Sequence, residues 1–235
     1  MPAPKARDLT ELALAFALSF AAVYLVNTPA YHYVSWALVV YLGLLVGIPV
    51  VSSVARGVNP LYDYGLKGTT SLRPAYFLAV LLLPLVLIPL LWNYSYSFTV
   101  AFAVVVAPFC EELFFRGYMA GRLASMGVVS ASVISALAFG AFHLGAQQFQ
   151  NPTAIVVLVL LGLVYGPVYL LTKSVYVTAA AHSAWNLFAY LILASPSTPL
   201  SYFSYVALGV IMGADIFLVL VEIASAQQLA SAPPE

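Results

Sequence analysis

The sequence predicts an all-α, polytopic transmembrane helical bundle. Of its 235 residues, 63% are hydrophobic and only 7% are charged, and apolar runs recur from residue 9 to residue 225. A soluble domain has about 25% charged residues, whereas crossing a hydrocarbon core about 30 Å thick takes about 20 mostly apolar residues. The chain is therefore expected to fold as a single integral membrane domain over residues 1–235, with the lipid bilayer around it.

Polar residues, prolines and glycines divide the apolar runs into about eight candidate transmembrane helices. They are expected at residues 9–27, 32–54, 75–93, 98–122, 129–148, 152–172, 174–194 and 202–225. The first run follows Lys5 and Arg7, as the core of a signal peptide would, but it is long and leads into further spans. We therefore expect it to be retained as the first helix.

Basic residues predict the orientation, because Lys and Arg in short loops are retained on the cytoplasmic side of a membrane. They lie before the first helix, at alternate connections and once inside a helix: Lys5, Arg7, Arg56, Lys67, Arg73, Arg116, Arg122 and Lys173. The intervening connections have none, so both termini are expected in the cytoplasm. The longest polar connection, residues 57–74, is interpreted as an ordinary cytoplasmic connection rather than a gate.

Charge and cysteine content exclude other classes of protein. Eight basic and eight acidic residues give a formal net charge of zero, so no basic surface for nucleic acid is expected. The single cysteine, Cys110, cannot form an internal disulfide. The chain also has no paired Cys and His tract of the structural zinc type.

Glycines and a proline predict how the helices pack and bend. Gly117 with Gly121, and Gly162 with Gly166, have the GxxxG spacing that lets helix backbones approach closely. Pro108 removes a backbone hydrogen bond, so it is expected to kink the fourth candidate helix just before its charged segment.

Three ionisable residues lie inside that fourth helix. Each ionisable residue at mid-bilayer costs roughly 2.5 to 3.5 kcal/mol on insertion scales, so such residues rarely persist without a purpose. Glu112 and Arg116 are four residues apart, on one helical face, where they can pair. Glu111 is rotated by about 100° and lacks that partner. We expect Glu112 to be a paired strut and Glu111 to be the carboxylate available for proton transfer.

Two histidines lie inside other candidate helices. His143 is on the fifth, and His182 shares a face of the seventh with Asn186, four residues on. A rise of 1.5 Å per residue from the cytoplasmic ends puts Glu111, His143 and His182 at depths of roughly 16, 21 and 12 Å. These depths are all near the middle of the bilayer, so the three side chains are expected to be able to meet.

This set of residues leaves two chemistries open. Glu111, helped by His143, could deprotonate a water molecule that attacks an amide carbonyl, while His182 and Asn186 donate hydrogen bonds to the oxyanion. Alternatively, Glu111, His143 and His182 match the ligand set of a catalytic Zn2+, which would activate the water itself. None of the three lies in an HExxH helix, the sharpest local sign of a zinc protease.

Three motifs occur in order along the chain: EExxxR at Glu111–Arg116, FxxxH at Phe139–His143 and HxxxN at His182–Asn186. Each motif alone is weak, but the ordered set resembles the CPBP intramembrane proteases. This family includes the type II CAAX prenyl endopeptidases and the bacterial Abi-type bacteriocin-immunity proteins. Its members are commonly labelled metalloproteases, although a metal-free glutamate mechanism is equally compatible with the motifs.

The resemblance implies an intramembrane endopeptidase with its catalytic core at residues 98–194. Its substrate would be a membrane-associated peptide or a prenylated protein. The implied roles are water activation by Glu111 and His143, and an oxyanion site at His182 and Asn186. The implied supporting residues are Glu112, Arg116 and Phe139.

Two other classes of protein stay open. A proton- or ion-coupled transporter would use acidic residues and histidines as relays, but it predicts polar residues that continue toward both faces of the membrane. A non-catalytic scaffold or immunity protein would keep the fold and be indifferent to Glu111→Gln. Asp215, in the last candidate helix, is a further functional candidate because an intramembrane aspartate is costly, and it has no assigned role.

Overall fold

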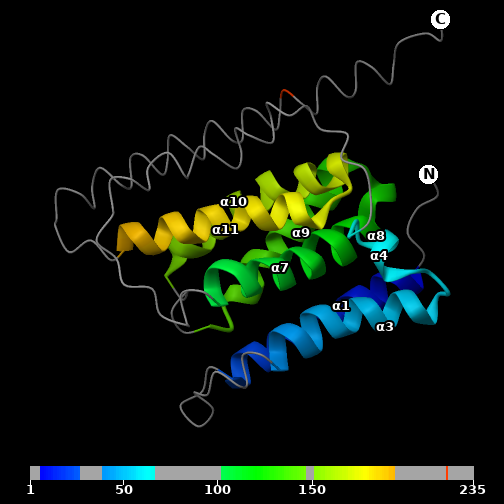
Figure 1. The fold of residues 1–235 in the computed structure, drawn as a ribbon. Coiled ribbons are helices and arrows are strands. Elements are labelled where there is room, and N and C mark those ends of the chain that lie inside the picture. The colour runs from blue at the N-terminus through cyan, green and yellow to red at the C-terminus, as the bar shows by residue number, and fades with distance from the viewer. Residues whose placement is uncertain (1–5, 27–38, 67–101, 147–150, 194–220, 222–235) are drawn as a thin grey trace, which may run out of the picture.

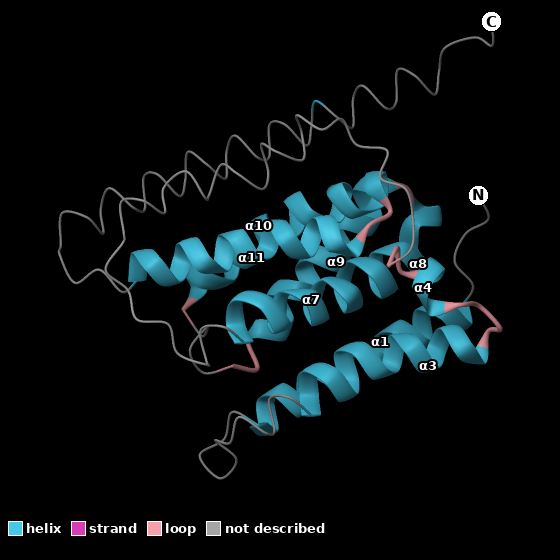
Figure 2. Ribbon diagram, in the orientation of Figure 1, coloured by secondary structure: helices cyan, strands magenta, loops and turns pink. Residues whose placement is uncertain are grey.

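The computed structural model of the protein describes residues 6–26, 39–66, 102–146, 151–193 and Val221. Every regular element in these residues is helical, as Figure 2 shows. The all-α class is therefore confirmed for this part of the chain. The candidate helix at 75–93 lies outside the described residues, as do Asp215 and, apart from Val221, the candidate helix at 202–225. The number of spans stays a prediction.

The N-terminal third of the described chain contributes two neighbouring rods. Helix α1 is Ala6–Val26, and the second rod consists of the π-helix η2, Val39–Val46, followed by α3, Gly47–Ala55. The two rods lie side by side at one edge of the bundle (Figure 1). Both coincide with the first two candidate helices over their described residues.

The central helix runs from Phe102 to Met126 and changes its hydrogen-bond spacing along its length. Its segments are η4, a π-helix at Phe102–Val106; α7, Ala107–Glu112; η5, a π-helix at Leu113–Ala120; α8, Gly121–Leu123; and η6, a 3-10 turn at Ala124–Met126. Every residue of η5 is buried, so this helix forms the middle of the bundle. Pro108 lies in the first turn of α7, where the spacing changes from π to α.

Three longer helices complete the described bundle: α9, Val128–His143; α10, Pro152–Thr172; and α11, Val175–Leu193. The bounds of α10 match the prediction, because Asn151 caps its first turn by accepting a hydrogen bond from the Thr153 N–H at 2.9 Å. Lys173, with a left-handed φ of 54°, ends it.

Helix α9 ends five residues earlier than the prediction of 129–148. After His143 the chain turns, and Gly145 packs against α1. A Cβ added there would lie 3.2 Å from Val23 Cγ1 and 3.3 Å from Tyr24 N. A side chain at residue 145 would therefore crowd α1.

Close packing of α9 on α10 depends on small residues. A Cβ added to Gly162 would lie 2.7 Å from Ala136 Cα, and one added to Gly166 would lie 2.8 Å from Ser132 Cβ. Both distances are shorter than real side chains adopt. The interpretation of the second GxxxG pair as a packing surface is confirmed.

The connection after α3 is packed onto the bundle over its described part. It contains α4, Pro60–Asp63, and then Tyr64, which is buried and donates a hydrogen bond to Pro49 O at 2.7 Å. Gly65 has a φ of +66°, and a Cβ there would lie 2.0 Å from Lys173 O. These contacts fit the interpretation of residues 57–66 as an ordinary connection, and residues 67–74 lie outside the described residues.

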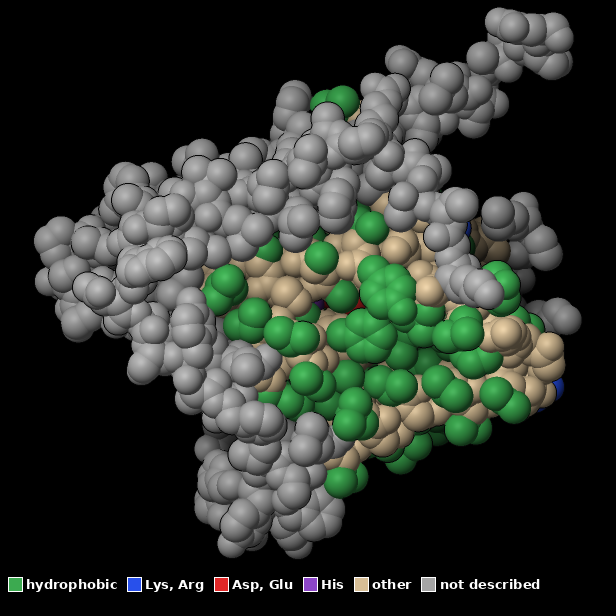
Figure 3. Space-filling model, in the orientation of Figure 1, with side chains coloured by type: hydrophobic (Ala, Val, Ile, Leu, Met, Phe, Trp, Pro, Cys, Tyr) green, Lys and Arg blue, Asp and Glu red, His purple; other side chains and the backbone are tan. Residues whose placement is uncertain are grey.

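Apolar side chains cover the outer surface. Within the described residues, Ala6–Leu25 and Pro152–Thr172 are long and apolar enough to cross a membrane, and Val39–Ala55 and Val128–His143 are shorter apolar helices. In the face shown in Figure 3, hydrophobic side chains spread over most of the described surface, and Lys and Arg are visible only at the end where α4 and α8 lie.

Candidate active site

The EExxxR motif lies in the buried centre of the bundle, at the junction of α7 and η5. Arg116 Nη1 is 3.1 Å from Glu112 Oε1, and both side chains are fully buried. The predicted i,i+4 pair is therefore confirmed. The contact is an ion pair without hydrogen-bond geometry, since no guanidinium nitrogen of Arg116 has a hydrogen-bond partner among the described residues.

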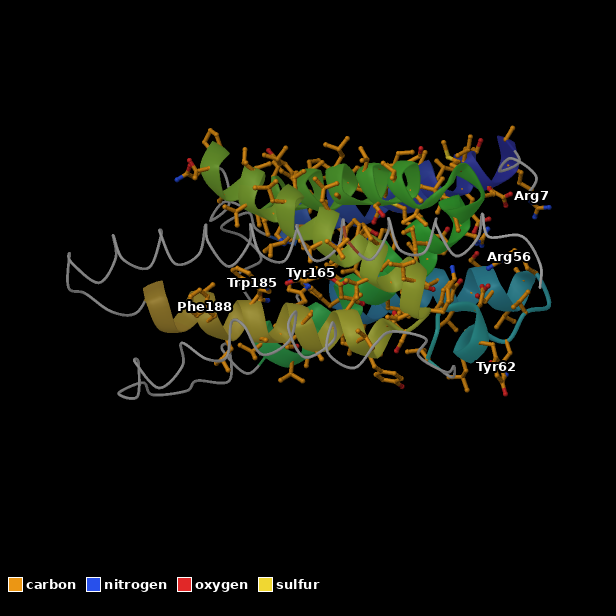
Figure 4. The ribbon with its side chains drawn as sticks, turned by 90° about the horizontal axis from the view of Figure 1, so that it is seen from above. Arg7, Arg56, Tyr62, Tyr165, Trp185 and Phe188 are labelled. Atoms are coloured by element: carbon orange, nitrogen blue, oxygen red, sulfur yellow. The ribbon has the colours of Figure 1, made fainter. Side chains whose placement is uncertain are left out.

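Aromatic rings provide the rest of the environment of Arg116. Its Cζ is 4.3 Å from the ring centroid of Phe139, 5.5 Å from that of Tyr165 and 6.0 Å from that of Phe115. Tyr165 lies in the interior, between the helices (Figure 4). A cation over ring faces in a desolvated site is stabilised by the ring quadrupole, so the cation is held by the Glu112 carboxylate and by these faces together.

His182 is the second partner of the Glu112 carboxylate. Its Nδ1 is 2.9 Å from Glu112 Oε1, and its ring stacks on Tyr165 with centroids 5.4 Å apart. An ionised carboxylate only accepts hydrogen bonds, so Nδ1 carries a proton that it donates to Glu112. The contact joins α11 to α7 and fixes the orientation of the imidazole.

His143 is oriented in the same way by its own helix. Its Nδ1 donates a hydrogen bond to the backbone oxygen of Phe139 at 2.8 Å. Because a carbonyl oxygen only accepts, the proton of the neutral ring lies on Nδ1 and its Nε2 is an acceptor. The ring of Phe139 packs edge-on against His143, with centroids 4.6 Å apart.

The carboxylate of Glu111 lies between the two imidazoles. Its Oε1 is 3.9 Å from His143 Nε2, and its Oε2 is 3.7 Å from His182 Nε2. All three side chains are buried, at 5%, 8% and 2% exposed for Glu111, His143 and His182. Both distances exceed a direct hydrogen bond and are of the size that one bridging water molecule spans. The expectation that these residues meet is confirmed.

Tyr41 reaches the same carboxylate from η2. Its hydroxyl donates a hydrogen bond to Glu111 Oε1 at 2.9 Å, and its ring packs edge-on against Phe102 with centroids 5.3 Å apart. The sequence analysis missed this residue. A tyrosine in an apolar run is a possible signal, since its hydroxyl needs a partner when buried, but the run gives no indication of which partner.

Asn186 contacts the start of the central helix. Its Nδ2 donates a hydrogen bond to the backbone oxygen of Ala103 in η4 at 2.8 Å. This carbonyl cannot receive a π-type hydrogen bond from the residue five positions on, because that residue is Pro108 and has no N–H. Asn186 therefore donates to a carbonyl to which Pro108 cannot donate. The second N–H of its amide is left for another acceptor.

A comparison with known families is consistent with this geometry. Residues 74–188 match the family model of the type II CAAX prenyl endopeptidases described as Rce1-like. Residues 74–188 belong to this family. The match contains all three motifs and confirms the resemblance to the CPBP proteases. No curated protein and no solved structure matches the chain.

The match of residues 74–188 to the Rce1-like model indicates the general class of the protein. The family consists of membrane-embedded proteases of the CAAX type, whose substrates are membrane-associated prenylated proteins. The apolar surface of the described helices agrees with a membrane environment.

Metal ligation was the alternative chemistry for the Rce1-like site. In the described part of the chain, no three His, Cys, Asp or Glu side chains are arranged to hold one metal ion. The candidate zinc ligands Glu111, His143 and His182 converge, but their arrangement is not that of a group holding one metal ion. No catalytic step is therefore assigned to a metal ion.

Proposed function

We propose that the protein is an intramembrane endopeptidase that hydrolyses a peptide bond of a membrane-associated, prenylated substrate. The observation that carries the proposal is the position of the Glu111 carboxylate between His143 and His182. Glu111 lies in α7, His143 in α9 and His182 in α11. The helices that supply these residues lie within 98–194, which we assign as the catalytic core of a single membrane domain.

The first step is activation of water. Glu111 Oε1 and His143 Nε2 are both acceptors and are 3.9 Å apart, so a water molecule between them donates one hydrogen to each. As its oxygen attacks the scissile carbonyl carbon, one proton passes to Glu111. The bond between carbon and water oxygen forms and the carbonyl π electrons move to the oxygen, which gives a tetrahedral oxyanion.

The second step is collapse of that intermediate. The carbon–nitrogen bond breaks, the carbonyl re-forms, and the proton held by Glu111 passes to the leaving nitrogen. Glu111 is thereby returned to its ionised form, and the acid and amine products together contain the atoms of one water molecule.

The oxyanion is stabilised by His182 and Asn186. Glu112 holds the ring of His182 through Nδ1. The donor in this step is the imidazolium form of His182, which donates Nδ1–H to Glu112 and Nε2–H to the oxyanion. The negative charge of Glu112 lies beside that ring, and Arg116 in turn balances the charge of Glu112. The second N–H of the Asn186 amide supplies the other donor.

The proposal includes an orientation. Arg7 and Arg56 lie at the same end of the bundle (Figure 4), and Arg122 contacts Asp8 of α1 at 3.3 Å at that end. This clustering supports a cytoplasmic location of that end of the bundle, and we propose the same side for both termini, as the distribution of Lys and Arg along the sequence predicts. The substrate then enters from the cytoplasmic side or laterally from the lipid.

The test is cleavage of a farnesylated C-terminal CAAX peptide by the purified protein in lipid vesicles. Glu111→Gln should abolish turnover, because general acid–base catalysis contributes typically about 100- to 10,000-fold, and should leave the folded yield intact. Glu11→Gln is the matched control, because Glu11 also accepts a tyrosine hydroxyl, that of Tyr118 at 3.0 Å, outside the site.

Each outcome separates the competing functions. Cleavage lost in Glu111→Gln and retained in Glu11→Gln and in a strong chelator supports the glutamate mechanism. Loss in the chelator would contradict it and favour zinc. No cleavage by the wild type would remove the CAAX peptide as substrate. A cellular role unaffected by Glu111→Gln would favour the scaffold, and proton or ion flux that the mutation stops would favour the transporter.

A further inference from the structure

Tyr41 contacts the candidate catalytic carboxylate from outside the family segment. It lies in η2, 70 residues before Glu111, and its hydroxyl is 2.9 Å from Glu111 Oε1. The family match covers residues 74–188, so neither the match nor any of the three motifs includes this tyrosine. The η2 rod packs against α7, which brings the hydroxyl to the carboxylate.

The two oxygens of Glu111 face different partners. Oε1 faces His143 and Oε2 faces His182, at 3.9 and 3.7 Å. The last torsion of a glutamate side chain is broad and roughly two-fold, and neither imidazole is within direct hydrogen-bond distance. The hydrogen bond from Tyr41 is the direct contact that the described residues make with Oε1.

We propose that Tyr41 is a positioning residue, which fixes the rotation of the Glu111 carboxylate so that Oε1 faces His143 and Oε2 faces His182. The inference rests on the proposed protease function, since it assigns a role to Tyr41 in the same site. The rotation matters because the bridging water must lie on the substrate side of one oxygen, and small misplacements of reacting groups are costly.

The tyrosine is itself held in place. Its ring packs at 83° to the ring of Phe102, with centroids 5.3 Å apart. Phe102 begins η4, the same π-helix whose Ala103 carbonyl is bound by Asn186. Tyr41→Phe therefore removes one hydroxyl and leaves the aromatic contact that orders this part of η2.

The experiment compares Tyr41→Phe with Tyr118→Phe in the vesicle assay. Tyr118 also donates its hydroxyl to a glutamate, Glu11 at 3.0 Å, and is buried. For Tyr41→Phe we expect kcat to fall about 10-fold or more, with KM within about two-fold of wild type, because geometry at the reacting group is lost while substrate binding is kept. Tyr118→Phe should leave both constants unchanged. Thermal unfolding of both variants gives the stability effect separately.

The infrared spectrum tests the same contact without substrate. The carboxyl band that disappears in Glu111→Gln should shift in frequency in Tyr41→Phe and stay unchanged in Tyr118→Phe. This readout keeps the Tyr41 inference testable even if the wild-type protein does not cleave the peptide, in which case the proposed function fails by itself.

Several results would overturn the inference. A Tyr41→Phe protein with the wild-type kcat, or with an unshifted carboxyl band, would show that the tyrosine only anchors η2. Equal loss of kcat in both tyrosine variants would mean a general effect of losing a buried hydroxyl. A raised KM with unchanged kcat would make Tyr41 a substrate contact instead.

Discussion

Two glutamates in this protein accept a tyrosine hydroxyl at nearly the same distance, yet their surroundings differ. Glu11 accepts from Tyr118 at 3.0 Å and is also within 3.2 Å of Arg122 Nη2. Glu111 accepts from Tyr41 at 2.9 Å and is flanked by two imidazoles. Among the described residues, no Lys or Arg ion pair is formed by Glu111.

The difference supports the proposed division between a structural carboxylate, Glu11, and a reactive one, Glu111. The side chain of Glu11 is 33% exposed and its charge is balanced by a guanidinium that also reaches Asp8. The side chain of Glu111 is 5% exposed, and its neighbours are two imidazoles rather than a guanidinium. A permanently charged partner fixes a carboxylate in one state, whereas titratable partners let a proton move.

The largest expected effect contrasts the two arginines. Arg116→Ala leaves Glu112 buried with its charge less well balanced, which should cost roughly 3 to 5 kcal/mol of stability. Arg122→Ala removes ion pairs whose acidic partners are about one-third exposed, so water can solvate the acids left behind and the loss should be smaller than for Arg116→Ala. Thermal or denaturant unfolding in detergent measures both. Similar losses in the two variants would contradict the contrast.

The next effect concerns the oxyanion donors. His182→Ala and Asn186→Ala should each lower the rate of peptide cleavage about 100-fold or more, since one lost donor typically has this effect. Asn151→Ala, which removes only the cap of α10, should reduce stability and leave the rate per folded molecule unchanged. A small change in rate with substrate binding retained would argue against the assigned donors.

The smallest expected effect concerns two glycines in helix contacts, Gly162 and Gly121. Gly162→Ala should cost about 1 to 3 kcal/mol through overpacking, because its Cβ would lie 2.7 Å from Ala136 Cα. Gly121→Ala should be neutral or slightly stabilising, since its Cβ would meet Tyr169 only at an ordinary 3.5 Å. Unfolding midpoints of the two variants check this order, and a reversed order would refute it.

Features within one helix could be predicted from the sequence. The pairing of Glu112 with Arg116 follows from helical geometry at i,i+4, and the bounds of α10 follow from Asn151, Pro152 and the break at Lys173. The convergence of Glu111 with both histidines could be expected from their similar depths in the membrane, because ionisable groups inside a bilayer face the bundle interior and pair with one another.

The particular atoms that pair between distant segments could not be predicted. Glu111 and Tyr41, and Glu112 and His182, are each 70 residues apart, and a pattern along one helix carries no information on which helix lies opposite. The π spacing of η2, η4 and η5 was also not predicted, because the expected helix faces follow 3.6 residues per turn. His143 is the last residue of α9 rather than an interior one, and the close approach of Gly145 to α1 just after it is again a contact between distant segments.

Burial of the candidate site has a consequence for supply. Each peptide bond that is hydrolysed consumes one water molecule, yet Glu111, His143 and His182 are all less than 10% exposed. Under the proposed mechanism, water must therefore reach the interior after every turnover before a second cycle can start. If water entry limits the rate, cleavage at saturating peptide should slow down under osmotic stress.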